Sequence, residues 1–154
     1  MNEKTHIIEQ ELLGYALQSN QPAIEMCNSF FQVSQTWDDL ADKDQDVTAQ
    51  QVNKMVVTVL EICNMSPFYR QYNYYLFPVI MDGIIDWMNA NDLEHSQSAD
   101  DRIIAYTLRD SFNSLVTHCA YLIGGFDWMN EVRMQVLRVA YDEPLQDYLE
   151  GLQR

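Results

Sequence analysis

Aspartates at helical spacing are the residues of this chain best suited to chemistry. The segment TWDDLADKDQD, residues 36–46, contains five aspartates in eleven positions. Asp38 and Asp42 are four residues apart, and so are Asp82 and Asp86 in a later predicted helix. Residues four apart share one face of an α-helix. If the two helices face each other, the four carboxylates provide the oxygen ligands that Mg²⁺ or Mn²⁺ prefers.

The run Asp38-Asp39-Leu-Ala-Asp42 also resembles the aspartate-rich DDxxD motif of class I isoprenoid synthases. That resemblance implies a small, Mg²⁺-dependent, all-α enzyme whose aspartates hold the metal against a diphosphate. Arg70, Arg102 and Arg109 are the cations that would help to bind the diphosphate. The chain departs from the family because it is shorter and because the second motif, Asp82-Gly-Ile-Ile-Asp86, has no leading pair of aspartates.

A simpler interpretation is that the acidic segment is solvated or faces a protein partner. The stretch PFYRQYNYYLF, residues 67–77, adds six aromatic side chains. Tyrosine and arginine are enriched at binding hot spots, although the same aromatics would also serve as a plug between helices. The predicted partner-binding residues from these two segments are Trp37, Asp38, Asp39, Asp42, Asp44, Tyr69, Arg70 and Tyr72.

Helices are expected to position all of these residues, because apolar side chains recur three and four residues apart along most of the chain. We predict helices over about 3–18, 22–42, 49–64, 78–91, 98–123, 127–141 and a short last one after Pro144. Thr48 and Gln51 have the spacing of a capping box, and Gly124-Gly125 is expected to end the fifth helix. The predicted fold is all-α, a bundle of six or seven helices in a single domain over residues 1–154.

Composition narrows the function further. The formal net charge is −14, with 23 acidic residues against 9 Lys and Arg. Binding to phosphates needs cations, so we expect no direct binding to nucleic acid or to an anionic membrane. No segment has the length of a membrane span, and we expect a soluble protein. The three cysteines, Cys27, Cys63 and Cys119, lie among apolar residues of predicted helices and are expected to be structural residues that act as small hydrophobic side chains.

Three stretches of the chain, two of which overlap the acidic and aromatic segments above, together resemble a family of small, uncharacterised proteins of tailed bacteriophages. They contain the motifs Trp-Asp-Asp-Leu from residue 37, Pro-Phe-Tyr-Arg-Gln from residue 67 and Leu-Ile-Gly-Gly from residue 122, in that order. The resemblance covers about residues 35–130 and implies a phage origin, a helical fold and a place in the host cytoplasm or the virion. It implies no activity.

The sequence therefore leaves two hypotheses. The first is a non-enzymatic protein-binding or virion-accessory protein, with a viral or host protein as partner, self-association left open and no cofactor. It is favoured because no nucleophile motif or phosphate-binding glycine loop is found. The alternative is the Mg²⁺ protein or enzyme built on Asp38, Asp42, Asp82 and Asp86.

Overall fold

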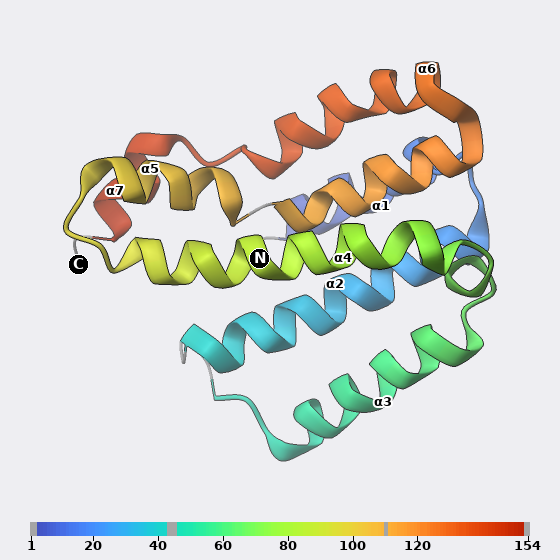
Figure 1. The fold of residues 1–154 in the computed structure, drawn as a ribbon, viewed down its shortest axis with the longest axis horizontal. Coiled ribbons are helices and arrows are strands. Elements are labelled where there is room, and N and C mark those ends of the chain that lie inside the picture. Colours follow the sequence, from blue (N-terminus) through green and yellow to red (C-terminus); the bar gives the residue numbers. More distant parts are fainter. Residues whose placement is uncertain (1–2, 43–45, 110, 153–154) are drawn as a thin grey trace. The chain divides into compact units, whose positions relative to one another are not determined.

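The computed structural model describes residues 3–42, 46–109 and 111–152, with the side chains of residues 3–9 and of residue 42 outside the described set. Over these ranges the chain forms α-helices and one short 3-10 helix (Figure 1). They are α1 (Glu3–Ala16), α2 (Gln21–Asp42), α3 (Ala49–Met65), α4 (Pro67–Glu94), α5 (Ala99–Leu108), η1 (Ser111–Asn113), α6 (Ser114–Ala140) and α7 (Leu145–Gly151). The predicted all-α class, with six or seven helices, is confirmed.

Side-chain caps set the start of two helices. The Thr48 hydroxyl accepts a hydrogen bond from the backbone N–H of Gln51, and Gln51 Oε1 accepts one from the Thr48 N–H at 2.8 Å. This is the predicted capping box, and it satisfies N–H groups that have no partner within the helix. Ser98 caps α5 in a similar way by accepting from the N–H of Asp101.

The prediction that Pro78 opens a helix is wrong. Helix α4 begins at Pro67, where a missing N–H costs nothing because the first turn has no acceptor for it. The break comes instead at Tyr72, whose φ of −120° and ψ of 17° are not helical. Asn73 donates a side-chain hydrogen bond to the carbonyl of Arg70 beside this kink, at 2.9 Å. Pro78 therefore lies inside the helix, and the proline that starts it is the one eleven residues earlier.

The single fifth helix predicted over residues 98–123 is also wrong. The structure divides this stretch into α5 and α6, with η1 between them. Ser111, Asn113 and Ser114 compete for backbone hydrogen bonds in this region, which weakens a continuous helix. Phe112 lies so close to Gly83 of α4 that a Cβ at residue 83 would meet the Phe112 ring at 2.8 Å.

Gly125 breaks α6 where the sequence predicted a break. Its φ of 79° lies in the left-handed region, which favours glycine. Helical structure continues on both sides of this residue. The preceding Gly124 is packed against Trp128, because a Cβ at residue 124 would meet the indole ring at 2.5 Å.

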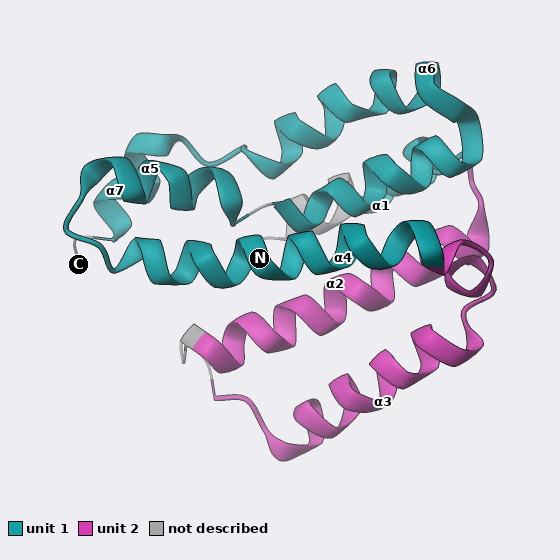
Figure 2. Ribbon diagram, in the orientation of Figure 1, with its two compact units in different colours: residues 1–18, 74–154 teal, residues 19–73 magenta. Residues whose placement is uncertain are grey.

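The chain divides into two compact units (Figure 2). The first comprises residues 1–18 and 74–154, and the second comprises residues 19–73. The prediction of a single domain over residues 1–154 stays a prediction. Within the described ranges, none of the helices combines the length and apolar character that a membrane span requires.

The first unit is built on contacts of α1 with α6, of η1 with α6 and of α5 with α7. The Trp128 indole N–H donates to the carbonyl of Ala16 at 2.8 Å and so fastens α6 to the end of α1. Tyr15 packs on the same ring, with 5.1 Å between ring centroids. The buried side chains of this unit include Leu13, Leu17, Leu76, Ile80, Leu115, Cys119, Val132 and Val136.

The second unit is a helical hairpin. Helices α2 and α3 lie side by side and run in opposite directions, as expected for two helices joined by a short connection (Figure 1). Its buried side chains include Ala23, Met26, Cys27, Phe30, Ile62 and Phe68. Cys27 and Cys119 are buried, whereas Cys63 is exposed.

Candidate functional site

Helix α4 has two apolar faces after its kink, and only one of them is in the core. The core face contains Leu76 and Ile80, which are buried. A second face, centred about 120° round the helix from the first, is exposed and contains large apolar side chains three or four residues apart. We call this the α4 stripe; its members are Tyr74, Phe77, Met81, Ile85 and Met88.

The α4 stripe is narrow and continuous. At about 100° per residue, its five members fall within an arc of about 80°. Their exposed fractions run from 38% for Met81 to 96% for Tyr74. Isolated exposed apolar residues are ordinary, but a contiguous row of this kind is typical of an interaction surface.

The surroundings of the α4 stripe are acidic. Between Arg70 and Arg102 the chain has no Lys or Arg. The same stretch contains six acidic residues, Asp82, Asp86, Asp92, Glu94, Asp100 and Asp101. Asp82 is exposed and falls about 80° round the helix from Tyr74, along one border of the stripe. An apolar row with this border is complementary to a partner that is apolar and positively charged.

The aromatic segment 67–77 divides at the kink. Before it, Phe68 is buried, Tyr69 packs edge-on against Phe30 with 6.2 Å between centroids, and Tyr72 packs on Phe68 at 4.9 Å. These residues form the predicted aromatic plug within the second unit. After the kink, Tyr74 and Phe77 are exposed and belong to the α4 stripe. The partner-binding role predicted for Tyr69, Arg70 and Tyr72 stays a prediction.

A second apolar feature lies between α2 and α3. It is a groove of about 340 Å³ lined by Val33, Trp37, Met55, Val56, Val59 and Leu60. We call it the hairpin groove. All six lining side chains are apolar, and half of them, Val56, Val59 and Leu60, are more than a third exposed. Trp37, one of the predicted partner-binding residues, therefore borders an apolar surface.

Asp38 and Asp39, which follow Trp37, lie on other sides of α2. Asp38 and Asp39 are half-buried, and Asp39 accepts a hydrogen bond from the Gln35 side chain at 3.1 Å. On the helical wheel they fall about 100° and 200° from Trp37. The side chains of Asp42 and Asp44, also predicted to bind a partner, lie outside the described residues.

The predicted metal site finds no support in the part of the chain that the structure describes. There, no three His, Cys, Asp or Glu side chains form a group that could hold a metal ion. Asp38 belongs to the second unit, whereas Asp82 and Asp86 belong to the first. Because the Asp42 side chain is not among those described, the four-carboxylate arrangement stays a hypothesis.

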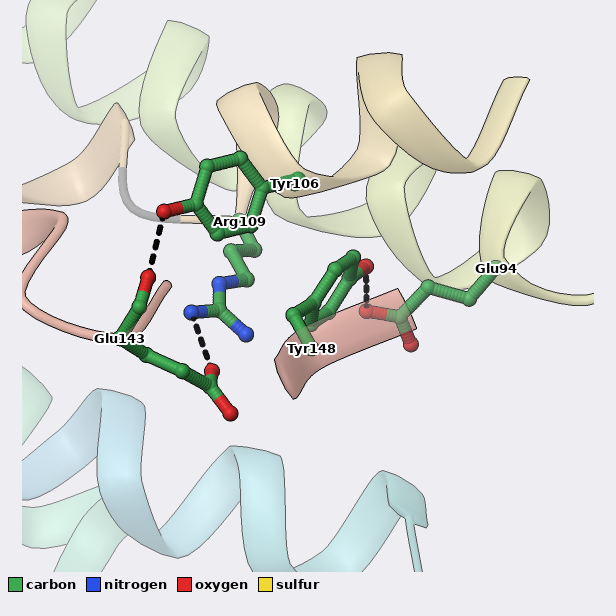
Figure 3. Close-up of polar contacts among 5 residues, drawn as sticks. All are labelled: Glu94, Tyr106, Arg109, Glu143 and Tyr148. Atoms are coloured by element: carbon green, nitrogen blue, oxygen red, sulfur yellow. Dashed lines mark hydrogen bonds and ion pairs between the residues drawn. The ribbon is translucent and has the colours of Figure 1, made fainter. Parts of the chain in front are cut away.

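A group of polar contacts in the first unit connects the end of α5 with the residues before α7, and α7 with the end of α4 (Figure 3). The Arg109 guanidinium forms an ion pair with Glu143 at 2.7 Å and lies 4.3 Å from the centroid of the Tyr148 ring. Tyr106 donates to the Glu143 carbonyl at 2.5 Å, and Tyr148 donates to Glu94 Oε1 at 2.5 Å. Burial, and then the hydrogen bond to Glu94, raises the pKa of the Tyr148 hydroxyl. The group is a set of structural bonds, since every polar partner named is already engaged with another protein group.

His118 is held in a similar way. Its Nδ1 lies 2.9 Å from the hydroxyl oxygen of Tyr75, and the Tyr75 ring also stacks on Tyr121. Partial burial, and then the charge of Arg133, lowers the pKa of His118 below its ordinary value. His118 is therefore a half-buried, hydrogen-bonded residue of α6.

Sequence reasoning placed none of the α4 stripe among the predicted site residues, although Tyr74 and Phe77 lie in the aromatic segment, and it missed five of the six residues that line the hairpin groove, all but Trp37. A signal was present, because α4 is apolar on almost every side, and a helix of that kind needs partners all round. Comparison with known proteins adds no relative, since no family model, curated protein or solved structure matches the chain.

Proposed function

We propose that this chain is a phage-encoded, non-enzymatic protein that binds a protein partner through the α4 stripe. The observation that carries the proposal is the two-sidedness of α4. One face is packed in the core, and a second face exposes five large apolar side chains in a single row. The resemblance of three motifs to tailed-phage proteins supports the phage origin and a role in the host cytoplasm or the virion.

The row has a favourable energy of burial. Moving a large apolar side chain out of water stabilises a complex by about 1.5–3 kcal/mol when the side chain becomes fully buried. The members of the α4 stripe are already 38–96% exposed, so much of this gain remains for a partner. Most of the binding energy of an interface comes from a few such residues near its centre.

The partner is a cationic amphipathic helix. A straight row at intervals of three and four is complementary to another helix, which presents its own apolar row at the same intervals. Lys or Arg residues beside that row would face Asp82 and its acidic neighbours on α4. A second copy of this chain is disfavoured at this surface, because its own acidic residues would then be opposed to these.

A designed peptide tests the proposal directly. The probe is a peptide helix of about five turns. Its Leu residues are spaced alternately three and four positions apart, and Lys residues lie on both sides of the Leu row. We expect it to bind, and we expect its Glu-for-Lys counterpart and a scrambled peptide of the same composition to bind at least tenfold more weakly. Fluorescence anisotropy at two salt concentrations measures all three, because salt weakens the contribution of charge.

Matched variants locate the binding site. Met81→Gln with Ile85→Gln removes two members of the α4 stripe without changing the net charge, and should weaken peptide binding at least tenfold. The control is Ile103→Gln with Ile104→Gln, which changes two exposed isoleucines of α5 and should leave binding unchanged. The scrambled peptide could bind as tightly as the designed one, and both variants could bind the designed peptide as tightly as the wild type does. That result would show unspecific attraction of cationic peptides to a protein of charge −14.

The same variants also test whether the face is available. Since Met81 and Ile85 are exposed, their replacement by glutamine should leave the melting temperature within about 1–2 °C of the wild-type value. A large loss of stability would mean that this face is packed within the native protein, and the proposal would fail. If the variant keeps its stability, a pull-down from infected host cells, with the double variant as control, identifies the natural partner.

A further inference from the structure

Helix α3 has more apolar surface than its contact with α2 uses. Among its residues, only Ile62 is buried. With Val52 at 0° on the helical wheel, the apolar arc extends from Ile62 at about 280° to Leu60 at about 80°. This arc of about 160° is wider than the stripe of about 100° that one neighbouring helix covers. The outer half of the arc contains Val52, Val56, Leu60 and Cys63.

Most of the outer half is exposed, with Val52 half-buried, and it adjoins the hairpin groove. Val56, at 51%, and Leu60, at 58%, are the most exposed of the groove's lining residues, and Cys63 is exposed as well. The groove and the exposed edge of α3 therefore form one surface, with Trp37 and Val33 on the α2 side. A helix laid along α3 would fill the groove with its own apolar side chains.

This surface has no charge on it. Lys54 and Glu61, the only charged residues of α3, both fall about 180° from Val52, on the opposite side of the helix. Asp38 and Asp39 lie on other sides of α2 than Trp37, as described above. A cationic partner would therefore gain little here, whereas a second molecule of an acidic protein could approach without repulsion between like charges.

Six apolar positions of α3, those that line the groove or its exposed edge, are symmetric about the midpoint between Val57 and Thr58, whereas Ile62 is mirrored by Asn53. Val56 mirrors Val59, Met55 mirrors Leu60, and Val52 mirrors Cys63. An interface related by a two-fold axis uses the same residues twice, so this symmetry suits two copies of α3 that run in opposite directions. Two helical hairpins joined in this way give a four-helix bundle, which is a stable arrangement of amphipathic helices.

We infer that the hairpin groove is filled by α3 of a second copy of this chain, in an antiparallel pair. The pairing places Val56 against Val59 of the second copy, near the axis, and Val52 against its Cys63. The protein is then a homodimer through the second unit, and the α4 stripe of the first unit stays available for a different partner. This inference does not rest on the proposed function, because it uses a different surface.

A single introduced cysteine tests the register. In Val52→Cys, the new thiol should lie next to the native Cys63 of the second copy and form an intermolecular disulfide with oxidised glutathione. Within one chain the two positions are eleven residues apart, about 16 Å along the helix, which is too far for a disulfide. We expect a covalent dimer on a non-reducing gel for this variant.

Two controls make the result specific to an antiparallel pair. The wild-type protein should give no covalent dimer, because the two Cys63 residues would be about 16 Å apart along the axis. A wild-type cross-link would show parallel pairing and overturn the inference. Gln50→Cys, on the polar side of α3, should also fail to cross-link, and cross-linking as fast as that of Val52→Cys would show random collision.

Mass measurement gives an independent answer. Light scattering should find the wild-type protein at twice its chain mass of 18.0 kDa at about 100 μM. Leu60→Glu, at 58% exposure, should shift the mass to that of a monomer with unchanged circular dichroism. Val57→Glu is the matched control, since Val57 is 51% exposed but falls at about 140° on the same wheel, outside the apolar arc, and it should stay dimeric. A monomeric wild-type protein at this concentration would overturn the inference.

Discussion

Tyr148 of α7 donates its hydroxyl hydrogen to Oε1 of Glu94, at the end of α4, over 2.5 Å. The two residues are 54 positions apart in the sequence. Helix α7 is only seven residues long and cannot be stable alone, because the first turn of a helix is costly to form. The bond, together with the Arg109 guanidinium over the Tyr148 ring, therefore holds α7 in place.

Removing this hydroxyl should destabilise the protein. Tyr148→Phe keeps the ring and leaves the partly buried Glu94 carboxylate without that donor, so we expect a loss of about 1–3 kcal/mol. Urea unfolding followed by circular dichroism measures the free energy of unfolding. The control is Tyr74→Phe, because Tyr74 is 96% exposed and should change stability by less than about 0.5 kcal/mol. Equal effects of the two substitutions would mean that the Tyr148–Glu94 bond contributes nothing.

Alkaline pH should act on the same residue. The folded-state pKa of Tyr148 is raised above its ordinary value of about 10, by burial and by the hydrogen bond to Glu94. A group of this kind contributes stability that is fully present below about pH 10 and is lost as the pH rises through its folded-state pKa. Unfolding free energies of the wild type should therefore fall above about pH 10. The unfolding free energy of Tyr148→Phe should fall less steeply with pH. The remaining decline is due to Tyr15, Tyr69 and Tyr75, whose pKa values are also raised.

His118 should make the protein sensitive to acid. Partial burial and Arg133 lower its folded-state pKa below the ordinary value of about 6.5. The unfolded chain then binds a proton that the folded chain does not, so stability is full above about pH 6.5 and decreases as the pH falls below it. Nuclear magnetic resonance of the imidazole should show the low pKa directly. His118→Gln should remove this part of the pH dependence, and an unchanged acid profile would contradict the assignment.

Two glycines should respond in opposite directions to alanine. At Gly83 a Cβ would meet Phe112 at 2.8 Å and its backbone Cα at 3.2 Å, so we expect Gly83→Ala to destabilise by about 1–3 kcal/mol. At Gly14, in α1, nothing lies within 4 Å of a Cβ, and Gly14→Ala should stabilise by about 0.5–1 kcal/mol. Thermal unfolding of both variants separates the effect of packing from that of helix propensity. Stabilisation at both positions would show that α4 and η1 do not approach as described.

Metal addition distinguishes the two hypotheses raised by the aspartates. A protein that binds no metal should keep its melting temperature in millimolar Mg²⁺ or Mn²⁺. A preformed site would gain about 2.7 kcal/mol at a hundredfold excess over its Kd. We expect little change, and we expect Asp38→Asn with Asp82→Asn to be neutral or mildly stabilising, because it relieves repulsion between like charges. A rise of several degrees that the double variant abolishes would favour the Mg²⁺ protein instead.

Sequence alone determined the helical class, the start of α3 and the break in α6. These features depend on contacts within a few residues. The capping box needs only Thr48 and Gln51, and the break needs only a glycine that accepts the left-handed conformation at residue 125. The absence of cations over residues 71–101 was likewise visible from composition.

The tertiary structure decided which apolar faces are covered and where helices are interrupted. Helix α4 is apolar nearly all round, so its sequence cannot say that Leu76 and Ile80 enter the core while Met81 and Ile85 stay exposed. The division between α5 and α6 likewise accompanies the approach of Phe112 to Gly83, which are 29 positions apart. Local sequence patterns indicate which secondary structure a segment can form. The burial of a side chain depends on which distant segment packs against it, and only the tertiary structure determines that contact.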